Sequence, residues 1–281
     1  MNKLLIHDIE EMAVYASEIR MRGDDIGLVP TMGALHQGHL SLIKKAAAEN
    51  EITIVSVFVN PIQFDSETDL ALYPKTLETD AEAAFSSGAD VVFAPSKDRM
   101  YPEGFSTFVD MTGLTEKLCG ASREAHFRGV LTVVNKLFGI CQPTRAYFGE
   151  KDAQQLAAVR KMAVELNMRI RIIGCPTVRE EDGLAMSSRN TRLSAEDRKT
   201  ARALYRALSL VKDSFISGNR DAGSLYKVLA DEIGAAPSAR LDYAEIVDPL
   251  TFEPVMTASE GDLVMLAVYI GDVRLIDNIK L

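Results

Sequence analysis

Two histidines three residues apart are the feature of this sequence with the clearest chemical meaning. His36 and His39 belong to the run PTMGALHQGH, which lies between an apolar run and an amphipathic helical pattern. A strand over 26–29 that turns into a helix over 40–49 would place both imidazoles at a helix N-terminus. Backbone N–H groups and the positive end of the helix dipole favour anions there. Two added imidazole donors suit a chain of phosphates.

Three interpretations of the histidine pair are open from these residues alone. The rings could simply cap the helix, or they could bind a metal, although the HExxH pattern of metalloproteases is absent. They could also donate to phosphates. Gly33 and Gly38 favour phosphate binding, because glycines let a ligand approach the backbone closely. The sequence contains neither GxxxxGK[ST] nor GxGxxG, the common alternatives for binding phosphate.

Two other segments carry cations suited to the same ligand. Lys151, in FGEKD, follows an expected strand and opens an expected helix. The run Met186-Ser187-Ser188-Arg189 offers two hydroxyls and a guanidinium. Such a set can surround a triphosphate and stabilise its charge as that charge redistributes during bond breaking. Taken alone, the first segment would be a surface Lys–Asp pair and the second a weak motif.

Neutral amides follow two of the expected strands. Asn60 and Gln63 come just after a buried run, and Gln155 lies one turn into the helix after Lys151. Such amides suit a substrate hydroxyl or carboxylate. Each could instead be a solvated loop group, but all fall at strand ends on one expected sheet edge, which strengthens the functional interpretation.

These side chains must be positioned by a sheet and its crossover helices. Apolar runs expected as strands cover 26–29, 52–59, 90–95, 145–149 and 170–173, and helical patterns lie around 40–49, 76–87, 129–141 and 153–166. Alternating strands and helices predict a parallel, doubly wound α/β sheet of Rossmann-like type. Ligands bind at the carboxyl edge of such sheets.

The pattern changes after Pro176. Ser194 is expected to cap a long helix that runs to about Ser217, a second helix covers 222–233, and strand-like runs occupy 241–247, 262–270 and 273–280. This predicts a smaller α+β domain with an antiparallel sheet, closed by a tight turn at Gly271-Asp272. We therefore expect one domain over 1–176, which carries the phosphate-binding sheet edge, and a second domain over 177–281. The polar stretch 177–190 is a natural hinge.

Composition excludes several classes of protein. The chain has 281 residues, 47% of them hydrophobic and 25% charged, with a net charge of −9. That charge disfavours nucleic acid as a partner, and no apolar run approaches the roughly 20 residues that span a bilayer. The N-terminus is unlike a signal peptide, and the three cysteines form no CxxC pair. We expect a cytoplasmic protein that binds neither nucleic acid nor membrane.

The ordered motifs resemble one family closely. They are PTMGALHQGH, FVNPIQF, YPKTLETD, HFRGVLTVVNKLF, YFGEKDAQQL and TVREEDGLAMSSRNTRLS. Together, from residue 26 to the C-terminus, they look like the pantothenate synthetase (pantoate–β-alanine ligase) family. This family belongs to the HxGH nucleotidylyltransferase superfamily, and MSSR stands in for the KMSKS-type loop of that superfamily.

The resemblance implies a two-step ligase reaction in pantothenate and coenzyme A biosynthesis. The carboxylate of (R)-pantoate attacks the α-phosphorus of ATP to give pantoyl adenylate and pyrophosphate, and the amine of β-alanine then releases AMP and (R)-pantothenate. The resemblance implies that the domain over 1–176 is the catalytic ATP- and pantoate-binding domain and that the domain over 177–281 is a lid. Mg²⁺ is implied with ATP, and a homodimer formed through the larger domain is implied as the assembly. The alternatives are a nucleotidylyltransferase that acts on another small acceptor and an inactive nucleotide-binding module.

The resemblance also implies roles for individual residues. His39 matches the catalytic proton donor, and with it we group His36, Lys151, Ser187 and Arg189 as catalytic. Gln63 matches a contact to pantoate and β-alanine, and Gln155 a second pantoate contact. The implied ATP-binding residues are Met32, Gly33, Ala34, Leu35, His36, Gln37, Gly38, His39, Gly149, Glu150, Lys151, Asp152, Val178, Met186, Ser187, Ser188 and Arg189. No protein ligand is assigned to Mg²⁺, which is expected to bind through the ATP phosphates.

One segment departs from the family pattern. Many members carry Arg-Pro-Gly-His-Phe where this chain has Arg123-Glu124-Ala125-His126-Phe127. The departure leaves the local turn and any role of Arg123 or His126 open, and we expect His126 to be structural.

Overall fold

The computed structural model describes residues 3–123 and 125–281, which form two compact units. The first unit comprises Met1–Glu150 and Ala158–Pro176, and the second comprises Lys151–Ala157 and Thr177–Leu281. Glu124, half of the departure from the family pattern, lies outside the described residues. A six-stranded sheet and a three-stranded sheet organise the chain.

The sheet of the first unit is parallel throughout, in the order β1-β4-β3-β2-β5-β6. Its strands are β1 (Leu4–Ile6), β2 (Ile26–Thr31), β3 (Ile52–Val57), β4 (Val91–Phe93), β5 (Arg145–Gly149) and β6 (Arg171–Cys175). The central strands β2 and β3 are apolar on both faces, and Leu28, Val29, Ile54 and Val55 are fully buried. Strands that read as continuous apolar runs are typical of sheets covered on both sides.

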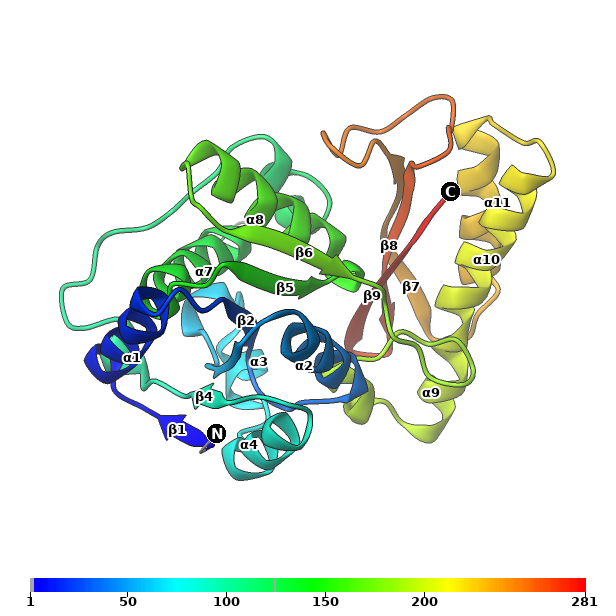
Figure 1. The fold of residues 1–281 in the computed structure, drawn as a ribbon. Helices are drawn as coiled ribbons and strands as arrows, with labels where there is room; N and C mark the ends of the chain where they lie inside the picture. The colour runs from blue at the N-terminus through cyan, green and yellow to red at the C-terminus, as the bar shows by residue number, and fades with distance from the viewer. Residues whose placement is uncertain (1–2, 124) are drawn as a thin grey trace. The chain divides into compact units, whose positions relative to one another are not determined.

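Helices cover both faces of this sheet (Figure 1). On one face, α2 (Gln37–Glu49) and α4 (Leu77–Ser86) contribute Ile43 and Ala84 to a core that includes Val29 and Val55. Helices α1 (Ile9–Met21) and α7 (His126–Cys141) pack on each other and against β2. The remaining helices of the sheet region are α3 (Glu67–Ala71), α5 (Lys97–Met100), α6 (Cys119–Ser122) and α8 (Ala153–Glu165). The predicted Rossmann-like, doubly wound fold is confirmed.

The strand order reverses between β2 and β5. From β2 the chain proceeds through β3 to β4 on one side, and β5 and β6 extend the sheet on the other. Ligands of doubly wound sheets bind beyond the carboxyl ends of the strands at such a switch point. The segments that leave these two ends begin at Met32, after β2, and at Glu150, after β5.

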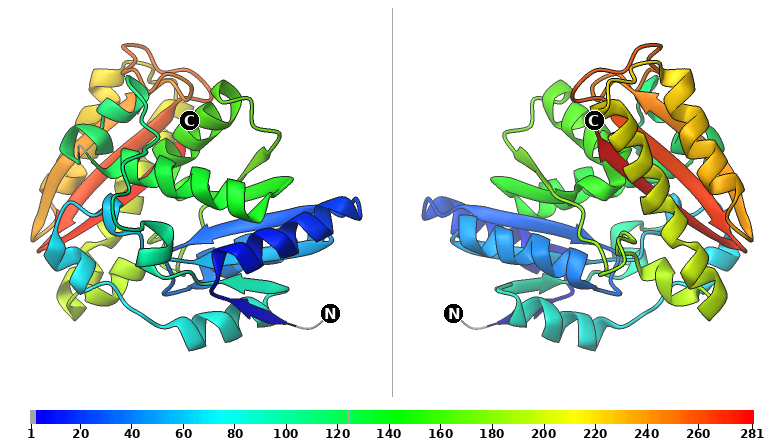
Figure 2. Two further views of the ribbon diagram at one scale, coloured as in Figure 1. Left: turned by 90° about the vertical axis from the view of Figure 1, so that its left-hand side faces the viewer. Right: turned by 90° about the vertical axis from the view of Figure 1, so that its right-hand side faces the viewer.

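The second unit has an antiparallel sheet of β7 (Ala239–Val247), β8 (Leu263–Ile270) and β9 (Val273–Lys280). Helices α10 (Arg202–Ile216) and α11 (Ala222–Gly234) lie against this sheet, as Figure 2 shows. Leu204 and Leu208 from α10 pack with Leu266 and Val268 from β8 in one core. The predicted smaller α+β fold is therefore present.

Several element boundaries differ from those expected. Strand β2 continues to Thr31, and α2 begins at Gln37 instead of residue 40, because His36 provides the N-cap. The single helix expected over 194–217 divides at Ala201 into α9 (Ala195–Thr200) and α10. An i→i+3 bond from Leu204 N–H to the Ala201 carbonyl (3.2 Å) tightens the chain there. Strand β1, only three residues long, and α1 were not expected.

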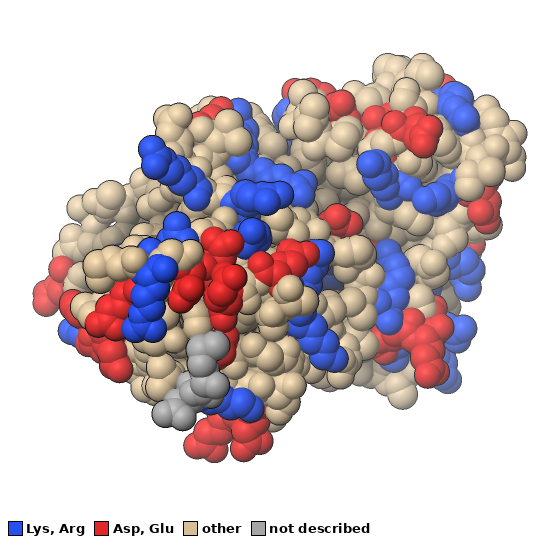
Figure 3. All heavy atoms as spheres, viewed as in Figure 1, with Lys and Arg blue, Asp and Glu red and all other residues tan. Residues whose placement is uncertain are grey.

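Charges of both signs are interspersed on the face shown in Figure 3. Some of them pair along helices, as Lys45 and Glu49 do at 2.7 Å. Among the described helices, none is long and apolar enough to cross a membrane.

Candidate active site

The chain leaves β2 through a turn that a buried carboxylate holds in place. Gly33 and Ala34 both have positive φ, 82° and 50°. Asp80, on α4 and 3% exposed, accepts hydrogen bonds from the backbone N–H groups of Ala34 (2.9 Å) and Leu35 (2.8 Å). A Cβ on Gly33 would lie 2.9 Å from a carboxylate oxygen of Asp80, so only glycine fits this close approach. Asp80 thus fixes the path of the chain into α2.

The two histidines then form a reciprocal cap on α2. Nδ1 of His36 accepts from the N–H of Gly38 (3.2 Å), and Nδ1 of His39 accepts from the N–H of His36 (3.3 Å). The ring centroids are 4.1 Å apart. A neutral ring that accepts at Nδ1 carries its proton on Nε2, so this hydrogen-bond pattern assigns the tautomer of both. Capping and phosphate donation are therefore compatible, since they use different nitrogen atoms.

A chain of buried hydrogen bonds orients the amide of Gln63. Burial raises the pKa of the Tyr101 hydroxyl, which stays protonated and donates to Oδ1 of Asn60 at 2.8 Å. Nδ2 of Asn60 in turn donates to Oε1 of Gln63 at 3.0 Å. The donor end of Gln63, Nε2, is then directed to Sδ of Met32 at 3.0 Å. Sulfur is a weak acceptor, so this N–H could exchange Met32 for a better partner.

The backbone of Gln63 is held from the side of α7. Its carbonyl accepts from Nη2 of Arg123 (3.1 Å) and from Nδ1 of His126 (2.9 Å). Gly129 allows the two segments to touch, since a Cβ there would lie 2.7 Å from the backbone of the 3₁₀ turn Pro61–Gln63. Arg123 and His126, whose roles the sequence left open, both contact the backbone that carries Gln63.

In the second unit, Lys151 lies in the 3₁₀ turn Glu150–Asp152. Its side chain is 18% exposed, and its Nζ is 3.9 Å from the carboxylate of Asp152. The carbonyl of Lys151 accepts from Nδ2 of Asn278 at 2.9 Å, which ties this turn to β9. Gln155 is half-buried in the first turn of α8. It belongs to the second unit and Gln63 to the first.

The segment after Pro176 is an ordered hairpin that ends in a 3₁₀ turn. The carbonyl of Val178 accepts from the N–H of Met186 at 3.0 Å, and Arg179 pairs with Ala185 in an antiparallel bridge. Ser187 caps the following turn, Ser188–Arg192, by accepting from the N–H of Arg189 at 3.3 Å. The expected cationic loop therefore has a defined backbone.

The expected site residues fall into two groups. The first unit holds Met32, Gly33, Ala34, Leu35, His36, Gln37, Gly38, His39, Gln63, Gly149 and Glu150. The second holds Lys151, Asp152, Gln155, Val178, Met186, Ser187, Ser188 and Arg189. Within the first group Gln63 contacts the histidine segment through Met32, and within the second Val178 contacts Met186.

Sequence reasoning missed the groups that hold these residues in place. Asp80 and Arg179 both occur in motifs that carried the family resemblance, YPKTLETD and TVREEDG, so those motifs were an available signal. Their burial and their partners depend on distant parts of the chain. Tyr101 and Asp277 gave no signal in the sequence.

Comparison with known proteins gives consistent matches over the whole chain. The family model described as pantoate-beta-alanine ligase matches residues 4–280. A pantothenate synthetase of Moorella thermoacetica is 50% identical over 99% of this chain and 98% of its own length. One from Clostridium acetobutylicum is 49% identical over 98% of both chains.

Solved structures agree with these matches. A pantothenate synthetase of Thermus thermophilus superposes with a TM-score of 0.94 at 43% identity, covering 99% of each chain. A pantoate-beta-alanine ligase from Francisella tularensis, solved with beta-gamma ATP and β-alanine, has a TM-score of 0.81 at 34% identity. It covers 99% of this chain and 97% of its own.

Proposed function

Because this chain belongs to the pantoate–β-alanine ligase family, we infer that it condenses pantoate with β-alanine in an ATP-dependent reaction. The observation that carries this conclusion is identity of 50% over 99% of the chain and 98% of a pantothenate synthetase. The reaction joins an acid to an amine and forms a C–N bond. The product is pantothenate.

We propose that the reaction proceeds through an adenylate. A carboxylate is a poor acyl donor, because its leaving group would be oxide. Attack of the (R)-pantoate carboxylate on the α-phosphorus of ATP breaks the α–β bond and releases pyrophosphate. The amine of β-alanine then attacks the acyl carbon, loses a proton, and displaces AMP to give (R)-pantothenate.

The histidine cap is proposed to stabilise the phosphates during adenylation. In His36 and His39 the tautomer with Nε2–H leaves each ring a donor atom distinct from its capping nitrogen. Both rings lie at the N-terminus of α2, where the helix dipole favours negative charge. Donors fixed before the reaction stabilise charge that develops in the transition state without reorganising. Residues 32–35 and 37–38 would line the same nucleotide segment.

Gln63 is proposed to bind pantoate and then β-alanine. Asn60 fixes the side-chain amide of Gln63, and Arg123 and His126 fix its backbone carbonyl. The Nε2–H of Gln63 is therefore a pre-oriented donor. A donor of this kind suits a carboxylate or hydroxyl. Gln155 is proposed as a second pantoate contact, from the first turn of α8.

The second unit is proposed to supply the cations and the remaining nucleotide contacts. Lys151 and Arg189 would neutralise charge on the phosphates, with Ser187 and Ser188 as hydroxyl donors. Asp152, Val178 and Met186 are proposed to contact the nucleotide from this unit, and Gly149 and Glu150 are proposed to contact it from the first unit. We assign the catalytic and substrate-binding work to 1–176 and a lid role to 177–281.

Mg²⁺ is proposed only as a partner of ATP. The parts of the chain that the structure describes contain no group of three or more His, Cys, Asp or Glu that could hold a metal ion. Bound to the phosphates, Mg²⁺ would neutralise part of their charge.

We also propose a homodimer in the cytoplasm. The three cysteines Cys119, Cys141 and Cys175 are free and buried, as suits a reducing compartment. Light scattering behind size-exclusion chromatography would give the mass of the assembly, and a monomer at micromolar concentration would contradict the dimer.

Pyrophosphate exchange tests the proposed function directly. Labelled pyrophosphate should enter ATP only when pantoate is present, and AMP should accumulate only after β-alanine is added. Exchange that proceeds without pantoate would instead indicate a nucleotidylyltransferase with another acceptor. Absence of exchange with every acceptor would indicate an inactive nucleotide-binding module.

A further inference from the structure

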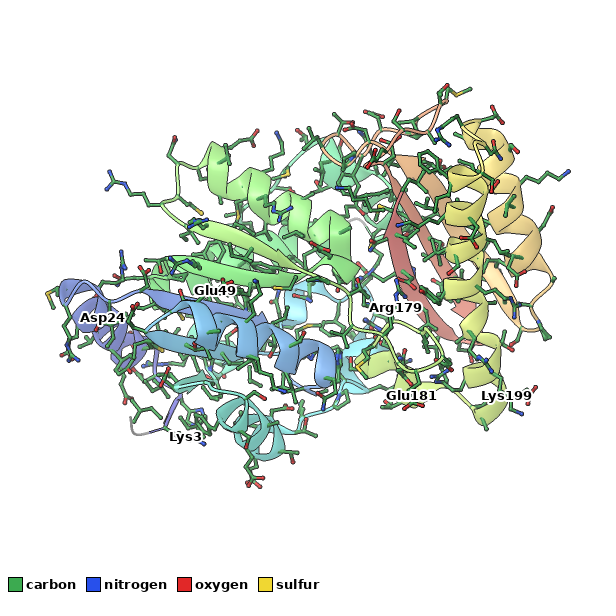
Figure 4. The ribbon with its side chains drawn as sticks, turned by 45° about the vertical axis from the view of Figure 1, so that its right-hand side comes forward. Lys3, Asp24, Glu49, Arg179, Glu181 and Lys199 are labelled. Atoms are coloured by element: carbon green, nitrogen blue, oxygen red, sulfur yellow. The ribbon has the colours of Figure 1, made fainter. Side chains whose placement is uncertain are left out.

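A buried ion pair lies beneath the hairpin that carries the proposed ATP-binding loop. Arg179 donates to both carboxylate oxygens of Asp277 on β9, from Nη1 at 2.6 Å and Nη2 at 3.0 Å. The Asp277 side chain is 1% exposed and that of Arg179 is 19% exposed. Figure 4 shows Arg179 beside β9. Neither residue has a role in the reaction as assigned above.

Arg179 contacts the hairpin and the sheet at the same time. Its guanidinium also donates to the carbonyl of Gly183 (3.0 Å) and to that of Asn278 (3.3 Å). The face of the guanidinium stacks on Tyr205, with Cζ 4.4 Å from the ring centroid. Gly183 lies so close to this ring that a Cβ would be 2.0 Å from Cδ1 of Tyr205. The turn of the hairpin therefore contacts the guanidinium of Arg179, and Asp277 of β9 fixes the position of that guanidinium.

The same strand also holds the turn that carries Lys151. Oδ1 of Asp277 accepts from the N–H of Asn278 at 2.8 Å, and the side chain of Asn278 donates to the carbonyl of Lys151 at 2.9 Å. Burial raises the pKa of Asp277, while the charges of Arg179 and Lys151 act in the opposite direction. Two adjacent residues of β9 thus anchor two segments that are more than twenty residues apart in the sequence.

We propose that Arg179, Asp277 and Asn278 are positioning residues. They fix Lys151 and the Met186–Arg189 segment relative to each other, so that both can bind the phosphates of ATP. The contribution is geometric, because the fork of a guanidinium fixes direction as well as charge. A lysine at position 179 keeps the charge that Asp277 requires but loses the fork. The part of this inference that concerns ATP binding rests on the proposed function. The part that says the cluster holds the hairpin in its folded conformation does not.

The test compares variants of this cluster with a matched pair on the same strand. Arg179→Lys and Asp277→Asn perturb the anchor. Arg274→Lys perturbs a second forked pair, in which Nε and Nη2 of Arg274 donate to one oxygen of Asp242 at 3.0 and 2.8 Å. The side chains of Arg274 and Asp242 are 17% and 19% exposed, so Arg274 matches Arg179 in exposure, while Asp242 is less buried than Asp277.

Steady-state kinetics of the full chain provide the first readout. In pantoate-dependent pyrophosphate exchange, the anchor variants should lose on the order of 10²-fold in kcat/KM for ATP, the usual effect of a displacement near 1 Å. Their KM for pantoate should change less than their KM for ATP, because the proposed pantoate residue Gln63 belongs to the other unit and only Gln155 shares the unit of the anchor. Loss of folded protein alone would lower kcat for both substrates and leave each KM unchanged. Arg274→Lys should match the wild type.

Limited trypsin digestion provides a readout that does not depend on activity. Cleavage after Arg189 and Arg192, followed by mass spectrometry, should be at least about threefold faster in Arg179→Lys than in Arg274→Lys, because cleavage tracks the opened fraction. If the wild type shows no pantoate-dependent exchange, the proposed function fails and digestion alone decides the anchoring. Equal cleavage in these two variants would overturn the inference, as would equal ATP kinetics in an active enzyme.

A milder variant covers the case in which both anchor variants fail to fold. Asn278→Ala removes the bond to the Lys151 carbonyl and leaves the Arg179–Asp277 fork in place. It should raise the KM for ATP about tenfold while trypsin cleavage of the 178–192 segment stays at the wild-type rate. An unchanged KM for ATP in this variant would overturn the part of the inference that concerns Lys151.

Discussion

Replacing Asp80 by alanine would show how strongly one carboxylate holds the turn in front of the histidine cap. The side chain accepts from the N–H groups of Ala34 and Leu35 and from the hydroxyl of Thr76 at 3.0 Å. Thr76 is exposed and can bond to water instead, so the cost comes from the two backbone bonds. At roughly 1.5–3 kcal/mol for each bond to a charged group, the loss of two bonds in Asp80→Ala should destabilise this turn by about 3–6 kcal/mol.

Hydrogen exchange at individual amides measures this quantity where it arises. The N–H groups of Ala34 and Leu35 should exchange at least about 10²-fold faster in Asp80→Ala, since 1.4 kcal/mol corresponds to a factor of ten. Asp80→Asn keeps one acceptor oxygen but turns an NH2 donor toward the other N–H group, so it should show at least half of the free-energy change. Glu82→Ala, an exposed carboxylate on the same helix, should change exchange at these amides by less than threefold, as expected for roughly 0.5 kcal/mol or less at the surface.

The same variants connect the turn to catalysis. If Asp80 fixes the position of His36, the rate of pantoate-dependent pyrophosphate exchange should fall on the order of 10²-fold in Asp80→Ala. It should remain at the wild-type level in Glu82→Ala. The reasoning is refuted if the amides of Ala34 and Leu35 keep their protection in Asp80→Ala. It is also refuted if these amides lose protection and the rate of pantoate-dependent pyrophosphate exchange stays at the wild-type level.

Three further predictions address other parts of the molecule. His39→Ala should lower the adenylation rate about a hundredfold, or on the order of 3 kcal/mol, with the fold retained by circular dichroism; a rate within threefold of the exposed control Lys44→Ala would make His39 structural. Gly183→Ala should lower the melting temperature, because a Cβ would meet Tyr205 at 2.0 Å and φ is +91°; an unchanged melting temperature in differential scanning calorimetry would contradict that packing. Arg198 holds the pKa of Asp182 below its ordinary value, so the stability from this pair is present above about pH 3.9 and is lost as the pH falls further. Urea midpoints of the wild type and Asp182→Asn should therefore differ at pH 6, and the difference should shrink as the pH falls below about 3.9; a difference that stays constant as the pH falls would contradict the linkage.

The sequence identified most of the architecture because its local patterns are strong. The apolar runs at β3 and β5 lie next to helical patterns that each bury one face, so the parallel sheet could be predicted without knowledge of contacts. Strand β1 escaped notice because three residues carry too little periodicity. The division of the 194–217 helix at Ala201 depends on an i→i+3 bond that no residue type signals.

The histidine pair could be found from the sequence, but its chemistry depends on tertiary structure. Residue types and spacing predicted that His36 and His39 lie at a helix N-terminus. They did not decide whether the rings cap the helix, bind a metal or bind phosphate. The folded backbone decided which nitrogen of each ring caps the helix and hence which one carries the proton. Hydrogen-bond direction is a property of atoms in space, and the spacing of two letters does not contain it.

The supporting groups were decided by tertiary structure alone. Asp80 meets Ala34 across 46 positions of the chain, and Arg179 meets Asp277 across 98. No local pattern encodes a partner at such separations, because the contact exists only once the sheet and its helices have packed. The sequence by itself therefore determined the fold class, the family and the residues that could do chemistry. The tertiary structure determined which buried charges hold those residues in place.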